Sequence, residues 1–269
     1  MLSYPVERVV CLSEETVEII YLLGKEEKIV GVTGYAIRPK IVRTQKPRVS
    51  SFISAKVDKI LKLHPDIVFT FSDVQANLSK ELISAGLNVL CFNQREIKEI
   101  YSMINIIGSL LCCSDEAINL VSTLKENLSK ISLRSSKNKR KPKIFFEEWD
   151  DPIITGIRWV SELIKIGGGI DIFDTKSRNY KSIDRVVNTQ EIVENNPDII
   201  IASWCGKKIN FDKIRNREKW NEINAIKDNH IYEIKSPLIL QPGPAALTEG
   251  IKEIENIISF WQNDKKYKN

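Results

Sequence analysis

Residues 61–72 read LKLHPDIVFTFS, and residues 193–204 read VENNPDIIIASW. In both stretches a helix is expected to end before the proline, because proline has no N–H to donate and its ring clashes with the preceding turn. An aspartate then precedes a run rich in β-branched residues, which predicts a strand buried on both faces. The same helix, Pro-Asp and strand unit therefore occurs once in each half of the chain.

Further strand-like apolar runs and amphipathic helices surround these two units. They occupy 8–12, 13–24, 28–33 and 79–92 in the first half, and 143–149, 161–169 and 220–234 in the second. Strands that alternate with helices are typical of mostly parallel sheets covered by helices. The two sets predict an α/β protein with two lobes.

One long helix is expected between the two sets. Residues 114–135 contain no glycine or proline, and their apolar residues are spaced by three and four: Ile118, Val121, Leu124, Leu128 and Ile131. This spacing predicts a single helix of about 20 residues, or about 30 Å. The expected organisation is an N-terminal α/β lobe (1–113), a connecting backbone helix (114–136) and a C-terminal α/β lobe (137–269).

The composition indicates a globular protein. Of 269 residues, 42% are apolar and 28% are charged, and the net charge is +5. No stretch has the roughly 18 uninterrupted apolar residues of a membrane-spanning helix. The basic run at 137–143 has no interleaved aromatic residues, so it predicts a solvated hinge and no nucleic-acid binding.

The N-terminus lacks a charged segment followed by an apolar one, so the chain as written is expected in the cytoplasm. If a leader was omitted, the alternative is a periplasmic or extracytoplasmic protein.

Cysteine and histidine usage predicts no disulfide framework and no metal site. Five cysteines form no Cys-x-x-Cys pair, and Cys11 and Cys91 lie in strand-like runs where a thiol acts as a small hydrophobe. The only two histidines, His64 and His230, have no partner at ligand spacing and are expected to face solvent or cap turns.

Aromatic residues gather where predicted strands end. Ligands of open α/β sheets bind at the carboxyl ends of strands, and aromatic walls suit a large rigid ligand. Packing beneath the next helix is the alternative for each aromatic residue. The residues expected to face a ligand are Tyr35, Phe52, Phe71 and Ser72 in the first half, and Trp149, Asp150, Arg158, Trp159, Trp204 and Pro242 in the second.

The acidic sequence EEWDD at 147–151 has two interpretations. Two close carboxylates divide acid and base roles in some enzymes. Alternatively, Asp150 and Asp151 cap the turn before Pro152, while Glu147 or Glu148 points outward from the strand. No nucleophile or histidine accompanies the cluster, and the chain has no phosphate loop or nucleophile elbow. This absence favours a binding protein over an enzyme, and no catalytic residue is predicted.

Three stretches carry a family resemblance: RVVCLSEETVEIIYLLG (8–24), FFEEWDDPIITGIRWVSELIKIGGGIDIF (145–173) and QPGPAALTEGIKEI (241–254). From about residue 6 to 262 the chain resembles the class III substrate-binding proteins of ABC importers, which bind cobalamin, haem and iron–siderophores. The second stretch resembles the cobalamin-binding members. The chain departs from the family pattern at Ser50-Ser51, where a glycine is common, and at Ala245, where an arginine is common.

The resemblance implies two Rossmann-like lobes joined by a long helix, with a corrinoid such as cobalamin held between them by burial and stacking. It implies no covalent or catalytic cofactor, a monomer, and an ABC transporter permease as the partner unless the chain is a cytosolic relative. Asp73 and Glu249 lie in regions suited to permease contacts. Haem, with Tyr35 as its ligand, and a ferric siderophore, with Arg158, are the alternatives within the class. An enzyme that acts on a bulky cofactor through EEWDD is the alternative from another class.

Overall fold

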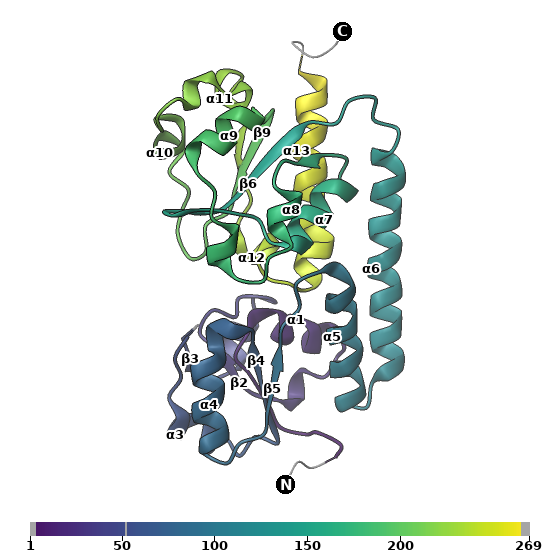
Figure 1. Ribbon diagram of the computed structural model, residues 1–269. Coiled ribbons are helices and arrows are strands. Elements are labelled where there is room, and N and C mark those ends of the chain that lie inside the picture. The colour runs from purple at the N-terminus through teal and green to yellow at the C-terminus, as the bar shows by residue number, and fades with distance from the viewer. Residues whose placement is uncertain (1–3, 52, 265–269) are drawn as a thin grey trace. The chain divides into compact units, whose positions relative to one another are not determined.

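The computed structural model describes residues 4–51 and 53–264 and contains two five-stranded sheets, one in each half of the chain (Figure 1). The chain divides into two compact units, Met1–Leu124 and Lys125–Asn269. The predicted fold class is confirmed: the protein is an α/β protein with two lobes, mostly parallel sheets and a long helix that joins the lobes in sequence.

The sheet of the N-terminal unit has the order β3-β2-β1-β4-β5 and is parallel throughout. Its strands are β1 (Val9–Cys11), β2 (Ile29–Thr33), β3 (Arg48–Ser50), β4 (Ile67–Phe71) and β5 (Val89–Phe92). The order reverses between β1 and β4, and the carboxyl ends of the two strands that flank such a reversal form a ligand crevice in open α/β sheets.

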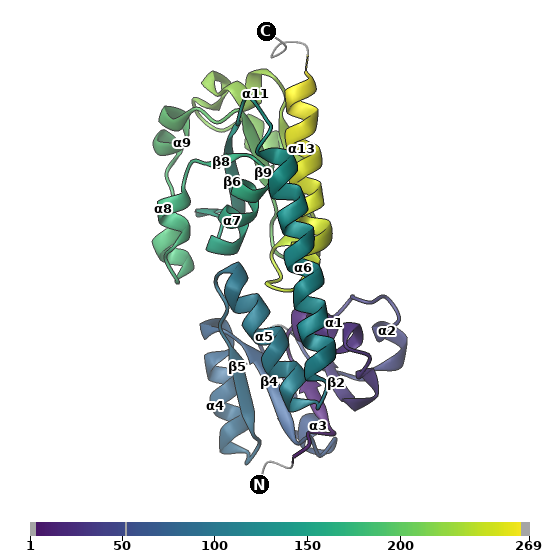
Figure 2. The same cartoon turned by 90° about the vertical axis from the view of Figure 1, so that its right-hand side faces the viewer.

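Helices cover both faces of this sheet (Figure 2). They are α1 (Glu14–Leu22), α2 (Val42–Gln45), α3 (Val57–Leu61), α4 (Ala76–Ser84) and α5 (Ile97–Leu110), with 3-10 turns at Glu26–Lys28 and Asp73–Gln75. Ile60 of α3 and Leu78 and Leu82 of α4 pack with Val10 and Val68 of the sheet. Helices α1 and α5 lie against each other on the opposite face.

The C-terminal unit is built on β6, which pairs with three of the other four strands, β7, β8 and β9. Its strands are β6 (Lys143–Asp150), β7 (Ile153–Thr155), β8 (Ile170–Asp171), β9 (Ile199–Ala202) and β10 (Ile231–Glu233). Only β7 runs antiparallel, as the second arm of a hairpin with β6. The sheet order is β10-β9-β6-β7, with β8 on the amino-terminal half of β6.

The helices of the C-terminal unit also form two layers. They are α7 (Arg158–Ile166), α8 (Asp174–Ser177), α9 (Thr189–Asn195), α10 (Phe211–Arg215), α11 (Asn224–Lys227), α12 (Ser236–Ile239) and α13 (Ile251–Asn263), with 3-10 turns at Ser182–Arg185 and Trp220–Glu222 and a π-helical turn at Ala246–Gly250. Ile192 of α9 and Ile214 of α10 pack with Phe145 of β6 and Ile200 of β9. Helices α7 and α13 contact each other on the other face of the sheet (Figure 1).

The connecting helix, α6 (Ser114–Ser135), forms where the three- and four-residue spacing predicts it. Val121, Leu124, Leu128 and Ile131 are buried as expected, but Ile118 is exposed and Ala117 takes its place on the buried face. The second half of α6 lies in the C-terminal unit, where Asn127 donates to the Leu247 carbonyl at 2.8 Å. Across the described residues, no helix is both long enough and apolar enough to span a membrane.

Two expectations about buried groups were wrong. Cys91 is exposed, because it lies on the outward face of the edge strand β5, whereas Cys11 in the central strand is buried. His230 does not face solvent: it is buried, and its Nδ1 lies 2.8 Å from the Tyr232 hydroxyl.

Candidate functional site

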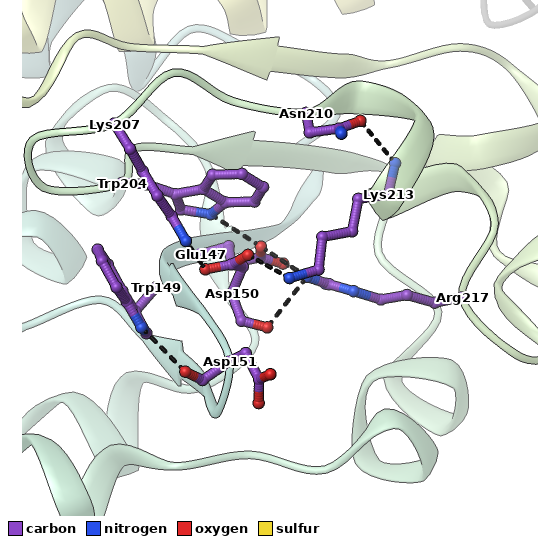
Figure 3. A network of polar contacts seen from close by, with 9 residues as sticks. All are labelled: Glu147, Trp149, Asp150, Asp151, Trp204, Lys207, Asn210, Lys213 and Arg217. Carbon is purple, nitrogen blue, oxygen red and sulfur yellow. Dashed lines mark hydrogen bonds and ion pairs between the residues drawn. The ribbon is translucent and has the colours of Figure 1, made fainter.

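Acidic, aromatic and basic side chains meet at the carboxyl ends of two neighbouring strands in the C-terminal unit (Figure 3). Strand β6 supplies Glu147, Trp149 and Asp150, and Trp204 follows β9. The segment after Trp204 supplies the basic side chains of Lys207, Lys213 and Arg217. We call this group of seven residues the strand-end cluster.

Glu147 anchors the buried side of the cluster. Its side chain is fully buried and receives two hydrogen bonds from the Arg217 guanidinium, at 2.5 and 2.9 Å, and one from the Trp204 indole N–H at 2.9 Å. Burial raises the pKa of Glu147 above its ordinary value, although Arg217 and Trp204 both stabilise the charged form. Glu147 does not point outward, because it is paired inside the unit. Glu148 is 21% exposed and accepts two hydrogen bonds from the buried Arg185.

Asp150 joins two lysines at the more open side of the cluster. It forms ion pairs with Lys207 and with Lys213, the latter at 2.5 Å, while its own side chain is almost fully buried. Burial would raise the pKa of Asp150, but the hydrogen bonds from the two lysines outweigh it and the pKa lies below its ordinary value. Asp150 is therefore a charged acceptor that orients two ammonium groups, and not the turn cap that the sequence suggested.

Lys207 also lies over two indole rings. Its Nζ is 4.1 Å from the centroid of Trp149 and 4.9 Å from that of Trp204. A cation over an aromatic face is attracted by the ring quadrupole. Trp149 is half-buried, and its indole N–H donates to the Asp151 carbonyl at 3.0 Å, which fixes the plane of the ring. The cluster thus presents a flat apolar surface next to ammonium and carboxylate groups.

The other second-half predictions lie in different settings. Arg158 is exposed at the start of α7 and pairs with Glu162 at 3.4 Å. Trp159 is only 3% exposed and donates its indole N–H to the Ile239 carbonyl at 2.9 Å, and Pro242 is buried. The structure gives Trp159 and Pro242 packing positions, so ligand contact by either one stays a prediction.

The first-half predictions lie at the strand ends of the N-terminal unit. Tyr35 follows β2 and is 48% exposed, and Phe71 ends β4 with the Arg95 guanidinium 5.8 Å from its ring centroid. Ser72 is buried with a positive φ of 52° and accepts a hydrogen bond from the Val74 N–H at 3.4 Å, so it shapes the turn after β4. Phe52 lies outside the described residues.

The sequence interpretation missed the three basic members of the strand-end cluster. Lys207, Lys213 and Arg217 lie 57 to 70 residues after their acidic partners in the chain. A usable signal was present, since a glutamate inside the apolar run KIFFEEW must find a buried cation or a hydrogen-bond donor. Which cation it finds is a tertiary fact that no local spacing encodes.

Carboxylates also gather at the point in the N-terminal sheet where the strand order reverses. Glu14 and Glu15 begin α1 immediately after β1. Burial raises the pKa of Glu14 to about 8, with further increases from Glu15 and Glu18, and burial raises the pKa of Glu15 to about 7. Glu18 forms an ion pair with Arg38 at 2.9 Å. Within the described part of the chain, no group of three or more His, Cys, Asp or Glu side chains is arranged to hold a metal ion.

Comparison with known proteins gives a consistent result. The family described as "Periplasmic binding protein" matches residues 9–238. An uncharacterized ABC transporter substrate-binding lipoprotein, YvrC of Bacillus subtilis, is 30% identical over 263 residues, which cover 94% of this chain and 80% of the relative. A vitamin B12-binding protein of Vibrio parahaemolyticus is 24% identical and covers 96% of this chain and 92% of its own length.

Among solved structures, a possible iron-binding (periplasmic solute-binding) protein of Staphylococcus epidermidis superposes with a TM-score of 0.81. It is 26% identical to this chain, and the match covers 94% of this chain and 99% of that protein. The similarity therefore extends over both units of the chain.

Proposed function

Because this chain belongs to the periplasmic binding protein family, we propose that it binds a corrinoid, cobalamin or a related compound, as the substrate-binding component of an ABC-type uptake system. The observation that carries the proposal is the strand-end cluster, in which the half-buried Trp149 indole lies beside Lys207 and Asp150. A relative that covers nearly the whole chain is a vitamin B12-binding protein, which supports this class of ligand.

The chemistry of the cluster suits a corrinoid. A corrin is a large, rigid and mostly flat macrocycle bordered by amides. Its flat face can bury against the Trp149 indole at a small entropic cost, because the ring is rigid and the indole is already fixed by its bond to the Asp151 carbonyl. Amide oxygens along the border can accept hydrogen bonds from Lys207 and Lys213, which Asp150 orients. No bond is made or broken in this process.

The proposed place of action is outside the cytoplasm. One relative is a lipoprotein of an ABC transporter, and the matched family is that of periplasmic binding proteins. These names favour the extracytoplasmic alternative over the cytoplasmic one, and they imply a permease as the partner. Cell fractionation of the native host, followed by immunodetection, tests this point: a cytoplasmic location contradicts it.

The direct test of the ligand is absorbance after mixing and desalting. The purified protein is mixed with cobalamin, passed through a desalting column, and measured for the corrin spectrum and for protein. Co-elution at about one corrinoid per chain is expected for the tight binding of an importer component. If the protein is colourless after cobalamin but retains haem in the same assay, the ligand assignment moves to haem. If it retains neither, the proposed function is wrong.

Trp149→Ala is expected to weaken cobalamin binding about 10- to 100-fold, because the flat apolar surface of the cluster is lost. Titration of intrinsic fluorescence or calorimetry measures the change. Tyr180→Ala is the matched control, since Tyr180 is an aromatic residue of the same unit that is 62% exposed and lies outside the cluster. Equal affinities for the wild type and Trp149→Ala would remove the cluster from the binding site.

A further inference from the structure

A cavity of about 320 Å³ lies between β3 and α3 in the N-terminal unit, outside the strand-end cluster. Its lining comes from β3 (Arg48–Ser50), from residues 51 and 54–56, and from α3 (Val57–Leu61). Its lining residues are Arg48, Val49, Ser50, Ser51, Ser54, Ala55, Lys56 and Lys59. The set contains three basic residues, three serines and no acidic residue.

The three basic side chains have no acidic partner. Arg48, Lys56 and Lys59 form no ion pair with any described carboxylate, whereas all three basic residues of the strand-end cluster do. Like charges repel, and three of them around one cavity raise its positive potential. An arrangement of this kind attracts an anion, and the charge of three cations exceeds what a single carboxylate would balance.

The cavity also contains an unsatisfied hydroxyl. The Oγ of Ser50 is buried and has no hydrogen-bond partner among the described residues. By contrast, the hydroxyls of Ser51 and Ser54 are 2.6 Å apart, and Ser51 also donates to the Ser54 carbonyl at 3.1 Å. A buried hydroxyl without a partner is uncommon, because its desolvation is not compensated. A ligand oxygen in the cavity would supply the missing acceptor.

Backbone contacts hold this stretch in place. Ser50 and Ala55 form an antiparallel bridge, the Ser51 N–H donates to the Ser54 carbonyl at 2.8 Å, and the Lys56 N–H donates to the Val49 carbonyl at 3.2 Å. The chain thus folds back onto the edge of the sheet and places Lys56 next to β3. The fold therefore sets the backbone positions of Val49 and Lys56, while the side chains of Arg48, Lys56 and Lys59 are exposed.

We propose that this cavity binds a phosphate group, with Arg48, Lys56 and Lys59 as its charge partners and the Ser50 hydroxyl as a neutral donor. A phosphate offers several strong acceptor oxygens, and guanidinium and ammonium groups are its usual partners. The volume exceeds that of a bare phosphate, so an esterified phosphate also fits. The simplest such group is free inorganic phosphate.

Titration calorimetry with inorganic phosphate at low ionic strength tests the site, because salt screens exposed charges. The wild type is expected to bind phosphate, and Lys56→Gln/Lys59→Gln is expected to bind it at least about tenfold more weakly, because charge-assisted hydrogen bonds are lost. Ser50→Ala, which keeps every charge, is expected to weaken binding about threefold by removing the neutral donor.

The control is Lys40→Gln/Lys80→Gln, which changes the net charge equally at two exposed positions outside the cavity lining. It is expected to bind phosphate like the wild type. The proposal is overturned if the wild type shows no phosphate binding. It is equally overturned if both double variants lose the same affinity, because the effect is then one of net charge.

Titrations of the wild type with cobalamin and with cobinamide, a corrinoid without the nucleotide arm, test the proposed function separately from this cavity. If neither corrinoid binds the wild type, the proposed function fails, while the phosphate titration still decides whether the cavity is a phosphate site.

Discussion

Arg217→Met is expected to lower the free energy of unfolding of the C-terminal unit by about 3–5 kcal/mol, because it leaves a buried carboxylate without its cation. Glu147 is fully buried, and Arg217 supplies two of its three hydrogen bonds. Methionine keeps the apolar length that packs beside Trp220, whose ring centroid lies 4.5 Å from the guanidinium carbon. Urea unfolding followed by tryptophan fluorescence measures the change.

Arg215→Met is the matched control for this change. Arg215 lies two residues earlier, is 40% exposed, and pairs at 3.4 Å with Asp212, which is 85% exposed. Exposed ion pairs contribute about 0–1 kcal/mol, so the control is expected to stay within that range. A second variant, Glu147→Gln/Arg217→Met, removes both charges and is expected to recover part of the loss. If Arg217→Met and Arg215→Met are equally stable, the buried pair does not stabilise this unit.

The periodic parts of the fold could be predicted from the sequence. The two Pro-Asp units gave β4 and β9 because proline ends a helix wherever it occurs and a β-branched run suits a buried strand. The connecting helix followed from its spacing in the same way. These features depend on residues close together in the chain, so the pattern alone is sufficient.

Elements that depend on tertiary contacts were missed or misplaced. Strand β7 has three residues, and it is a strand only because it pairs with β6 across the turn at 151–152. Helix α5 is amphipathic over 14 residues, but no glycine marks a boundary between it and β5. The sequence analysis did not predict it. Ile118 is exposed because Ala117 fits closely against Gly108 of α5, an approach that a larger side chain would prevent.

Only part of the strand-end cluster could be predicted from the sequence. The principle that ligands bind at strand ends selected Trp149, Asp150 and Trp204, which the structure brings together in one cluster. The three cations that complete the cluster come from a segment whose composition, rich in lysine and arginine, is equally typical of a solvated surface. Their role depends on Glu147 and Asp150 being buried. The residue type alone does not tell whether a given glutamate or aspartate is buried or exposed.

Glu15→Gln is expected to make the protein more stable than the wild type at high pH and to leave it unchanged at low pH. Burial raises the pKa of Glu15 from its ordinary value of 4.5 to about 7 in the folded state. The folded state therefore holds a proton that the unfolded state releases, so stability is fully present below about pH 4.5 and is lost as the pH rises through about 7. The full loss is about 3 kcal/mol, since each pKa unit corresponds to about 1.4 kcal/mol.

Glutamine has the shape of the protonated acid and cannot ionise, so it should abolish this loss. The Glu15 Oε2 has no hydrogen-bond partner among the described residues, and Oε1 lies 3.5 Å from the Gln94 amide nitrogen, so neither oxygen has a cation to stabilise its charge. Thermal unfolding of both proteins between pH 4 and pH 9 gives the difference, which is expected to grow with pH. Glu81→Gln, at an exposed position on α4 of the same unit, controls for the general effect of removing a carboxylate. A Glu15→Gln protein that tracks the wild type at every pH would mean that Glu15 ionises freely in the folded state, and that the strand-order reversal of this sheet tolerates a buried negative charge.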